Sequence, residues 1–408
     1  MTQTHNLLQD WMRTPNVRTV IKALCADGAK ARFVGGCVRD AILNRPINDI
    51  DIATEEKPEA VMALLYRSGI KAIPTGISHG TITAVVGSQT FEITTLRSDL
   101  DTDGRHAKVK FTNDWQADAE RRDFTINTLS LSPDGQLFDY LGGRQDILQG
   151  QIRFVRNAKT RIKEDVLRIL RFYRFFADYG IAPADAEARA ACFEMAPSLK
   201  KLSGERVCRE ILKLLASRDP VPSIKIMQAD GVLSHCLTKS ANLNRLERLI
   251  AIEKKISANI GSCNMNVEMR LSALVDNNIS EITRVAKLLN LPSCFRKRLH
   301  AATGPTPDED RLHEALYRLG SRTVQDRLTL AWSLDDEIDL PSSVLSTISN
   351  WQTPNFPLTG KDGLAAGMAP GPELGHTLSV IEDWWVNNNF LPDREHCLRK
   401  LRSLISCI

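Results

Sequence analysis

The chain of 408 residues lacks the patterns that mark membrane, secreted and zinc-binding proteins. No stretch approaches the roughly 18 consecutive apolar residues that a membrane-spanning helix needs, so no membrane partner is expected. The N-terminal residues show no basic cluster followed by an apolar segment, so we expect no secretory signal. Nine cysteines are scattered without any Cys-x-x-Cys pair, which argues against a zinc site or a disulfide framework. We therefore expect reduced, mostly buried thiols and a cytoplasmic protein.

The remaining composition is ordinary, with 43% hydrophobic and 25% charged residues, and it excludes wholesale disorder. Charge is distributed unevenly along the chain. Residues 1–150 carry 17 Lys/Arg against 19 Asp/Glu, residues 151–218 carry 15 against 8, and residues 219–408 carry 21 against 22. The whole positive excess thus lies in one short central segment. Such a segment suits a phosphate-rich partner, although a solvated basic face is an equally valid interpretation.

The first 150 residues are expected to form a mixed α/β region, and the rest to be helical. Apolar periodicity predicts helices near 17–24 and 38–43, and β-branched runs predict strands at 31–34, 49–53, 81–86 and 91–95. The last two strands are separated by Gly87-Ser88-Gln89-Thr90, which predicts a hairpin. From about residue 158 the pattern is helical almost throughout, interrupted by glycine and proline.

Acidic residues at two places could form a metal site. Alternate residues of a strand share a face, so Asp49 and Asp51 are expected to point the same way, opposite to the core. Two neighbouring carboxylates repel each other, and a divalent cation such as Mg²⁺ relieves that repulsion. Glu92 would complete a three-carboxylate cluster if its strand lay beside the first. A solvent-facing acidic pair is the alternative interpretation.

Two further segments carry groups that suit a nucleotide. Adjacent glycines at 35–36 follow a strand and precede a helix, where backbone amides can approach an anion closely, and Arg39 follows one turn later. Arg122 and Asp123 belong to an Arg-Arg-Asp sequence that can hold both the charged and the hydroxylated parts of a nucleotide. The alternative for the glycine pair is an ordinary tight connection between strand and helix. The alternative for the Arg-Arg-Asp sequence is a salt bridge at the start of a helix.

Charged residues recur at every third position of an otherwise apolar stretch, 164–176. Apolar residues surround the predicted helix, so we expect it to be largely buried. Buried guanidinium groups need partners, and one aspartate cannot satisfy three arginines. The remaining partners are either phosphates and a base edge or an internal salt-bridge network. The charged residues with this spacing are Asp165, Arg168, Arg171 and Arg174.

Taken in order over residues 31–217, these segments resemble the class II tRNA nucleotidyltransferase/poly(A) polymerase family. The motifs are Gly-Gly-x-Val-Arg-Asp, Asp-x-Asp, Phe-Glu-Ile-Thr-Thr, Arg-Arg-Asp-Phe-Thr-Ile-Asn, Asp-Tyr-x-Gly-Gly and Glu-Asp-x-x-Arg. Six motifs in the family's order are far more specific than any one of them. The segment 203–215 is similar to the family's helix-stabilising segment. The stretch 97–110 is similar to its mobile loop, with Ala107 where proline is usual.

The resemblance implies an α+β fold and a role for each candidate residue. The fold would have a small polymerase-β-like nucleotidyltransferase head with a mixed sheet at 1–150, a helical neck at 151–218, and a helical body and tail at 219–408. Asp49 and Asp51 would be the Mg²⁺ ligands, with Glu92 as the third catalytic acid. The nucleotide-binding residues would be Gly36 and Arg39 for the triphosphate, Arg122 and Asp123 for ribose and phosphates, Asp165 and Arg168 for the base, and Arg171 and Arg174 for the phosphates.

The implied reaction is template-independent addition of C, C and A to tRNA 3′ ends from CTP and ATP, with release of pyrophosphate at a two-metal site. Base chemistry fits this independently. Cytosine and adenine each present an exocyclic amine beside a ring-nitrogen acceptor, whereas guanine and uracil present an oxygen beside an N–H. A carboxylate that accepts and a guanidinium that donates therefore match cytosine and adenine.

Four other activities are compatible with parts of this sequence pattern. A poly(A) polymerase shares the motifs, but bacterial members usually carry a basic Gly-Arg-Arg-Phe-like stretch where this chain has Pro74–Gly80. An enzyme that adds only CC or only A stays open, although the mobile loop has full length. An RNA-binding module with an inactive site is disfavoured because all three acids are present. A phosphohydrolase is disfavoured because none of the eight histidines precedes an aspartate.

Overall fold

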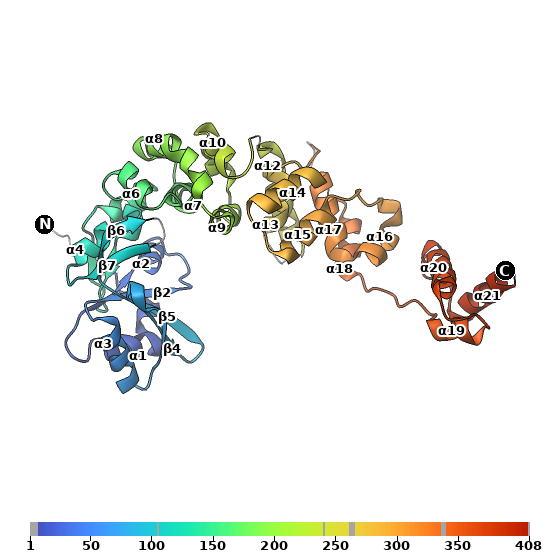
Figure 1. Cartoon of the computed structure of the whole chain (residues 1–408), viewed down its shortest axis with the longest axis horizontal. Helices are drawn as coiled ribbons and strands as arrows, with labels where there is room; N and C mark the ends of the chain where they lie inside the picture. The colour runs from blue at the N-terminus through green and yellow to red at the C-terminus, as the bar shows by residue number, and fades with distance from the viewer. Residues whose placement is uncertain (1–6, 104–105, 240, 261–265, 336–339, 407–408) are drawn as a thin grey trace. The chain divides into compact units, whose positions relative to one another are not determined.

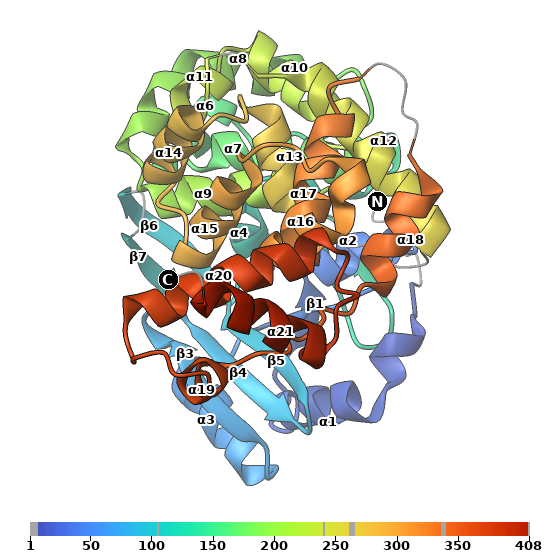
Figure 2. The same ribbon diagram turned by 90° about the vertical axis from the view of Figure 1, so that its right-hand side faces the viewer.

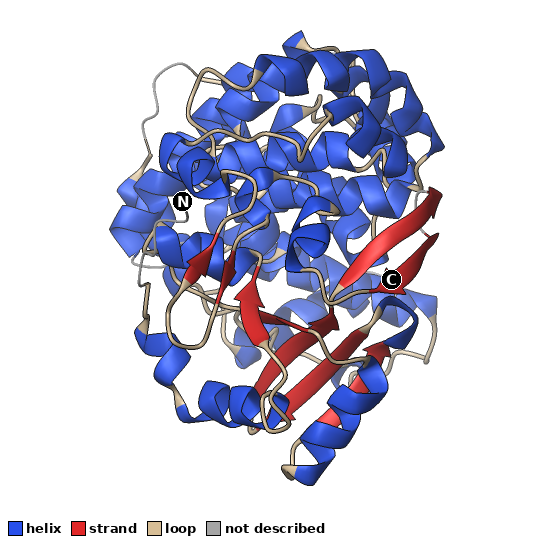
Figure 3. Ribbon diagram, turned by 90° about the vertical axis from the view of Figure 1, so that its left-hand side faces the viewer, coloured by secondary structure: helices blue, strands red, loops and turns tan. Residues whose placement is uncertain are grey.

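A computed structural model describes residues 7–103, 106–239, 241–260, 266–335 and 340–406. The chain divides into two compact units, which are Met1–Ala241 with Leu288–Asn290, and Asn242–Lys287 with Leu291–Ile408. In the described part of the chain, strands occur in the first unit and the second is helical (Figure 3). This arrangement confirms the expected α+β class. The finer division into head, neck, body and tail stays a prediction.

The first unit contains a seven-stranded mixed sheet in the order β3-β4-β5-β2-β1-β8-β9. β2 runs parallel to β5, and the other neighbouring strands are antiparallel. Helices α1 and α3 pack together and both contact β4 (Figure 2). The strands are β1 (Ala31–Val34), β2 (Ile50–Thr54), β3 (Lys71–Gly76), β4 (Thr81–Val86), β5 (Gln89–Thr95), β8 (Ser130–Leu131) and β9 (Leu137–Phe138). The helices around them are α1 (Pro15–Leu24), α2 (Gly36–Ile42), α3 (Pro58–Arg67), α4 (Trp115–Glu120) and α5 (Gly143–Gln149), with 3-10 turns η1 (Asp10–Arg13), η2 (Ile77–His79) and η3 (Thr125–Asn127).

Two hairpins differ from the prediction. The turn between β4 and β5 is shorter than predicted, because Gln89 and Thr90 belong to β5 and Val86 pairs with Gln89. Gly87, with φ at 61°, supplies the positive φ that a two-residue hairpin turn requires. The segment expected as a loop forms a separate two-stranded antiparallel sheet of β6 (Arg97–Asp103) and β7 (His106–Phe111).

The Asp-Tyr-x-Gly-Gly motif caps α5 and fixes its approach to η3. The carboxylate of Asp139 accepts hydrogen bonds from three backbone N–H groups around the start of α5, at 2.9 to 3.2 Å. These donors would otherwise lack intrahelical partners. A Cβ at Gly143 would collide with the carbonyl oxygen of Thr125 in η3. Only glycine therefore lets α5 pack this closely against the segment that follows Asp123.

Replacing Gly143 by alanine is expected to destabilise the protein by about 1–3 kcal/mol, because the backbone of η3 cannot give way without a shift. Thermal unfolding followed by circular dichroism measures the effect as a lower Tm. Gly360→Ala is the matched control, since a Cβ at Gly360 would meet nothing within 4 Å. Equal melting temperatures for Gly143→Ala and the wild-type protein would contradict the argument.

Helices complete the first unit around an aromatic cluster. The Phe124 ring lies 4.8 Å from Phe154 and 5.3 Å from Phe175, between ring centroids, and Phe154 stacks on Phe172 at 6.0 Å. These contacts join the segment after Asp123 to helix α7, which also packs against α9 and α10 (Figure 1). The helices are α6 (Ala158–Glu164), α7 (Arg168–Tyr179), α8 (Ala186–Met195), α9 (Gly204–Leu215), α10 (Val221–Ala229) and α11 (Leu233–Cys236), with the 3-10 turn η4 (Ala196–Lys201).

The second unit is helical and has two apolar clusters, one around Leu316 and Leu328 and one around Ile381 and Trp385. Among the residues that the structure describes, no helix combines the length and the apolar character needed to cross a membrane. Seven described cysteines are free and five of them are buried, as expected. The helices are α12 (Leu243–Ile260), α13 (Val267–Leu274), α14 (Ile279–Leu288), α15 (Ser293–Ala302), α16 (Leu312–Leu319), α17 (Ser321–Trp332), α18 (Ser342–Asn350), α19 (Gly360–Ala365), α20 (Pro372–Asn387) and α21 (Arg394–Ile405), with the 3-10 turn η5 (Glu309–Arg311).

Candidate active site

Strands β2 and β5 bring the three predicted acids together. Asp51 in β2 is the register partner of Glu92 in the parallel strand β5. Asp49 directly precedes β2, which begins at Ile50 and not, as predicted, at Asp49. Asp51 is half-buried, whereas Asp49 and Glu92 are exposed. The sequence-based condition that the two strands be neighbours is therefore met.

The electrostatics of this acidic edge fit a divalent cation. Burial and the charges of Glu92 and Asp49 raise the pKa of Asp51 to about 6, although Arg122 acts in the opposite direction. This repulsion is of the kind that Mg²⁺ relieves, and carboxylate oxygens are ligands that Mg²⁺ prefers. Within the described ranges, no three His, Cys, Asp or Glu side chains form a complete metal-binding group. Mg²⁺ usually completes its coordination with substrate phosphates and water, so two carboxylates are a suitable protein share.

A pocket of about 730 Å³ opens beside Asp51. Ten cationic and four carboxylate side chains line it, so the pocket suits a polyanion. Nine of the eleven predicted site residues belong to its wall, and only Asp49 and Glu92 do not. The nine are Gly36, Arg39, Asp51, Arg122, Asp123, Asp165, Arg168, Arg171 and Arg174.

The turn between β1 and α2 closes one end of this pocket. Gly35 has φ at 71°, a conformation that side chains other than glycine's rarely allow. A Cβ at Gly35 would lie 3.4 Å from the Arg122 guanidinium and 3.8 Å from the Asp51 carboxylate. The first glycine of the Gly-Gly pair thus lets the chain turn close beside both a cation and one of the three predicted acids.

Arg39 is held rigidly in the pocket wall, with only 8% of its surface exposed. Its guanidinium donates to the side-chain oxygen of Asn127 at 2.8 Å, to the Tyr179 hydroxyl at 2.6 Å and to Asp40 at 3.1 Å. The guanidinium carbon also lies 4.0 Å from the centre of the Tyr179 ring. Residues from α2, η3 and α7 thereby fix one cation before any ligand arrives.

All three residues of the Arg-Arg-Asp segment form ion pairs with other parts of the first unit. Arg121 and Arg122 both pair with Asp118, at 2.8 and 3.1 Å. Burial acts to raise the pKa of Asp118, but the two guanidinium groups outweigh burial and lower it. Asp123 accepts from the Arg171 Nε at 2.7 Å, and this pairing likewise lowers the pKa of Asp123 against the effect of burial.

The structure corrects the prediction of one helix over 164–176. Helix α6 ends at Glu164 and α7 begins at Arg168, so Asp165 does not share a helix with the three arginines. Asp165 has an extended backbone, with φ −151° and ψ 107°, and its carboxylate accepts from the backbone N–H of Leu167 at 3.1 Å. Aspartate favours such positions because its short side chain bonds nearby backbone donors.

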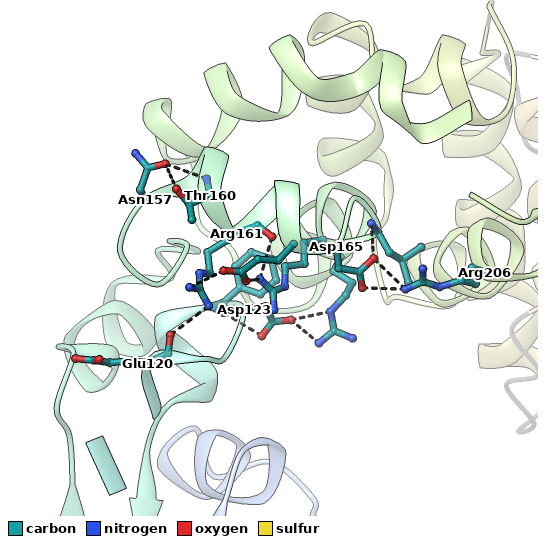
Figure 4. Close-up of polar contacts among 12 residues, drawn as sticks. Glu120, Asp123, Asn157, Thr160, Arg161, Asp165 and Arg206 are labelled. Carbon is teal, nitrogen blue, oxygen red and sulfur yellow. Dashed lines mark hydrogen bonds and ion pairs between the residues drawn. The ribbon is translucent and has the colours of Figure 1, made fainter. Parts of the chain in front are cut away.

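Asp165 and the three arginines that follow it at this spacing each have an ion-pair partner outside the set. Arg206 of α9 donates to both carboxylate oxygens of Asp165, at 2.8 and 2.9 Å (Figure 4). The salt-bridge network exists, and its members other than Glu164 also line the pocket. The arginine side chains keep 13 to 32% of their surface exposed, so α7 is not apolar on all sides as predicted. The other pairs are Arg168–Glu164, Arg171–Asp123 and Arg174–Glu210, at 2.5 to 2.7 Å.

Sequence reasoning missed part of the pocket wall. Helix α9 contributes four lining residues, although its segment was assigned only a stabilising role. Their spacing of three, four and seven residues places them on one face of a helix, and this pattern was available in the sequence. The four are Arg206, Arg209, Glu210 and Lys213. The remaining lining residues, none of which had been given a role of its own, are Gly35, Arg121 and Asn127 of the predicted motifs, with Arg97, Leu167 and Phe175.

Comparison with known proteins now decides the family. Two family models match the chain, "Poly A polymerase head domain" over residues 31–153 and "Probable RNA and SrmB- binding site of polymerase A" over residues 185–241. The mitochondrial CCA tRNA nucleotidyltransferase 1 of Mus musculus is 32% identical over 402 residues, which cover 95% of this chain and 90% of that protein. The chain belongs to the CCA tRNA nucleotidyltransferase family. The family recognised from the six motifs is thereby confirmed.

Further relatives agree with this membership. The CCA-adding enzyme of Lactobacillus delbrueckii subsp. bulgaricus is 31% identical, covering 88% of this chain and 90% of that protein. The structure of the Bacillus stearothermophilus CCA-adding enzyme in complex with CTP has a TM-score of 0.77 and 25% identity, and it covers 97% of this chain and 98% of its own. The Thermotoga maritima CCA-adding enzyme complexed with tRNA, 19% identical with a TM-score of 0.68, covers 99% and 100% and shares the fold.

Proposed function

We propose that this member of the CCA tRNA nucleotidyltransferase family adds C, C and A to tRNA 3′ ends from CTP and ATP and releases pyrophosphate. The observation that carries the proposal is that Asp51, Asp165 and Arg168 line the same pocket. Relatives named as CCA-adding enzymes, one of them solved with CTP, support the choice of reaction and substrates. The cytoplasmic location stays a prediction.

The triphosphate of the incoming nucleotide would bind where Gly36, Arg39 and Arg122 meet. Arg39 and Arg122 are already oriented by hydrogen bonds and ion pairs, so they stabilise developing phosphate charge without reorganising. Arg171 and Arg174 extend this positive wall. Asp123 would orient Arg171 and contact the ribose.

Asp49 and Asp51 would hold Mg²⁺, with Glu92 as the third acid beside them. Bound Mg²⁺ supplies activation of the RNA 3′-hydroxyl and neutralisation of charge on the leaving pyrophosphate. Asp51 is half-buried and lines the pocket, so a cation held by its carboxylate would lie next to the phosphate that reacts rather than in bulk water. The protein's own contribution to catalysis is thus to hold the acids close to the place where the phosphates bind.

Base selection would depend on Asp165 and Arg168. The carboxylate accepts from the exocyclic amine of cytosine or adenine, and the guanidinium donates to the adjacent ring nitrogen. Uracil and guanine would place an oxygen and an N–H at these positions and leave both protein groups unpaired. The enzyme would therefore select CTP and ATP without a template. The basic segment 151–218 and the helical remainder would hold the tRNA by shape and phosphate.

Incubation with tRNA that ends at the discriminator base is expected to yield CCA addition followed by a stop. Labelled CTP and ATP with sequencing of the product measure the outcome, and EDTA should abolish the reaction until Mg²⁺ is restored. Products ending in CC or extended by A alone would identify a partial enzyme. Long oligo(A) tails made from ATP alone would instead establish a poly(A) polymerase.

A further inference from the structure

The cations that line the pocket fall into two groups. Seven of the ten form ion pairs with carboxylates: Arg39, Arg121, Arg122, Arg168, Arg171, Arg174 and Arg206. Arg97 donates to the carbonyl oxygen of His79. Arg209 and Lys213 differ, because within the described part of the chain neither has a hydrogen bond or an ion pair from its side chain. Both are exposed, and both line the pocket.

The two side chains stand one turn apart on α9. At this spacing their Cβ atoms are about 5–6 Å apart, and like charges so placed repel each other. Glu210 lies between them in sequence but is buried against Arg174, at 2.7 Å, and does not relieve the repulsion. The arrangement therefore weakens the helix slightly in the free protein. An anion bound to both side chains would turn the repulsion into a binding contribution.

The position of the pair indicates which anion this is. Arg206, one turn before Arg209 on α9, holds Asp165, so Arg209 stands beside the residue assigned to the base, while Glu210 between the pair holds Arg174 of α7. All residues assigned to the triphosphate lie on elements other than α9. The reaction joins the last RNA nucleotide to the incoming one, so their bases become neighbours in the product. Phosphates that reach the base side therefore belong to the RNA strand.

We propose that Arg209 and Lys213 bind backbone phosphates of the unpaired 3′ end of the tRNA, as a subsite separate from that of the nucleotide. The assignment rests on the proposed function, because it takes RNA to be the strand that is extended. The strand must advance by one nucleotide at each addition, while the nucleotide site is used again. Long cationic side chains without protein partners can follow a moving phosphate, whereas the paired arginines are fixed.

The test compares Arg209→Ala/Lys213→Ala with wild type by fluorescence anisotropy in EDTA. The two probes are tRNA ending in CC, which has three unpaired 3′ nucleotides, and the same tRNA shortened by those three nucleotides. The variant should bind the full-length probe about tenfold more weakly, and the slope of log affinity against log salt should fall by about 1.4 for two single-strand contacts. Both proteins should bind the shortened probe equally. The variant's KM for CTP should stay within about twofold of the wild-type value, with an unchanged or higher Tm, because removal of the pair relieves repulsion.

Lys57→Ala/Lys71→Ala is the matched control, since it removes two exposed cations of the first unit that do not line the pocket. It should leave the difference between the two probes unchanged. Equal affinity of variant and wild type for the full-length probe would overturn the proposal, and so would a loss that persists on the shortened probe. A raised KM for CTP with unchanged RNA affinity would overturn it by assigning the pair to the triphosphate. A wild-type protein that binds tRNA but adds no nucleotide would refute the proposed function. The comparison of the two probes would still decide whether Arg209 and Lys213 bind the 3′ end.

Discussion

Asp51→Ala and Asp49→Ala are each expected to lower kcat at least about a hundredfold, a loss of at least ~2.7 kcal/mol of transition-state stabilisation. Both carboxylates stand at the acidic edge where β2 meets β5, and Asp51 also lines the pocket. Single-turnover incorporation with saturating CTP and tRNA lacking CCA measures the loss without interference from product release. Either variant retaining more than about a hundredth of wild-type kcat would contradict the assignment as metal ligands.

The same variants should fold and bind tRNA nearly as the wild type does. Neither side chain belongs to the apolar core, and removal of Asp51 relieves its repulsion with Glu92, so the Tm measured without Mg²⁺ should not fall. Asp27→Ala is the matched control. Asp27 forms an exposed surface pair with Arg67 at 2.7 Å, and such pairs contribute only about 0–1 kcal/mol. The control should therefore keep both activity and stability.

The acidic edge was predictable because it depends on local rules. A strand alternates its side chains with a period of two, so the sequence places Asp51 and Glu92 on faces opposite to their buried neighbours. The sequence did not decide whether the two strands pair, because that pairing is a contact between segments about 40 residues apart. In the structure β2 and β5 are neighbours, with Asp51 opposite Glu92. The six ordered motifs had already indicated it through the family resemblance.

Features that depend on distant partners were not predictable in the same way. Residues around Asp165 are compatible with a continuous helix, and besides the local bond to the Leu167 N–H, the break is accompanied by a pairing with Arg206, 41 positions later. Strand β3 was not predicted either. It is an exposed edge strand interrupted by Pro74, and it is defined by pairing with β4 rather than by its own alternation. Ion-pair partners for α7 on α9 likewise appear only when the helices pack.

The proposed base-recognition pair, Asp165 and Arg168, yields the most specific prediction for activity. Arg168→Ala should weaken the use of CTP and ATP alike, because in the proposed site the guanidinium would donate to the ring nitrogen that both bases share. Asp165→Ala should relax discrimination against UTP and GTP, because in the proposed site the carboxylate would reject them by being left unpaired against their carbonyl oxygens. Although Asp165 already accepts from Arg206, a carboxylate has about four acceptor positions and retains capacity for a base amine.

A purely structural salt-bridge network would behave differently. Either substitution would then lower the Tm without changing the relative use of the four nucleotides. The cost would stay below the ~3–5 kcal/mol of a fully buried orphaned charge, because the Asp165 and Arg206 side chains keep 24% and 27% of their surface exposed. Arg206→Ala is the control that removes the ion pair of Asp165 but keeps its carboxylate, so nucleotide selection should largely survive. Values of kcat/KM for all four triphosphates, measured beside melting curves, separate the two cases. Unchanged nucleotide ratios in both Arg168→Ala and Asp165→Ala would refute the base-recognition role.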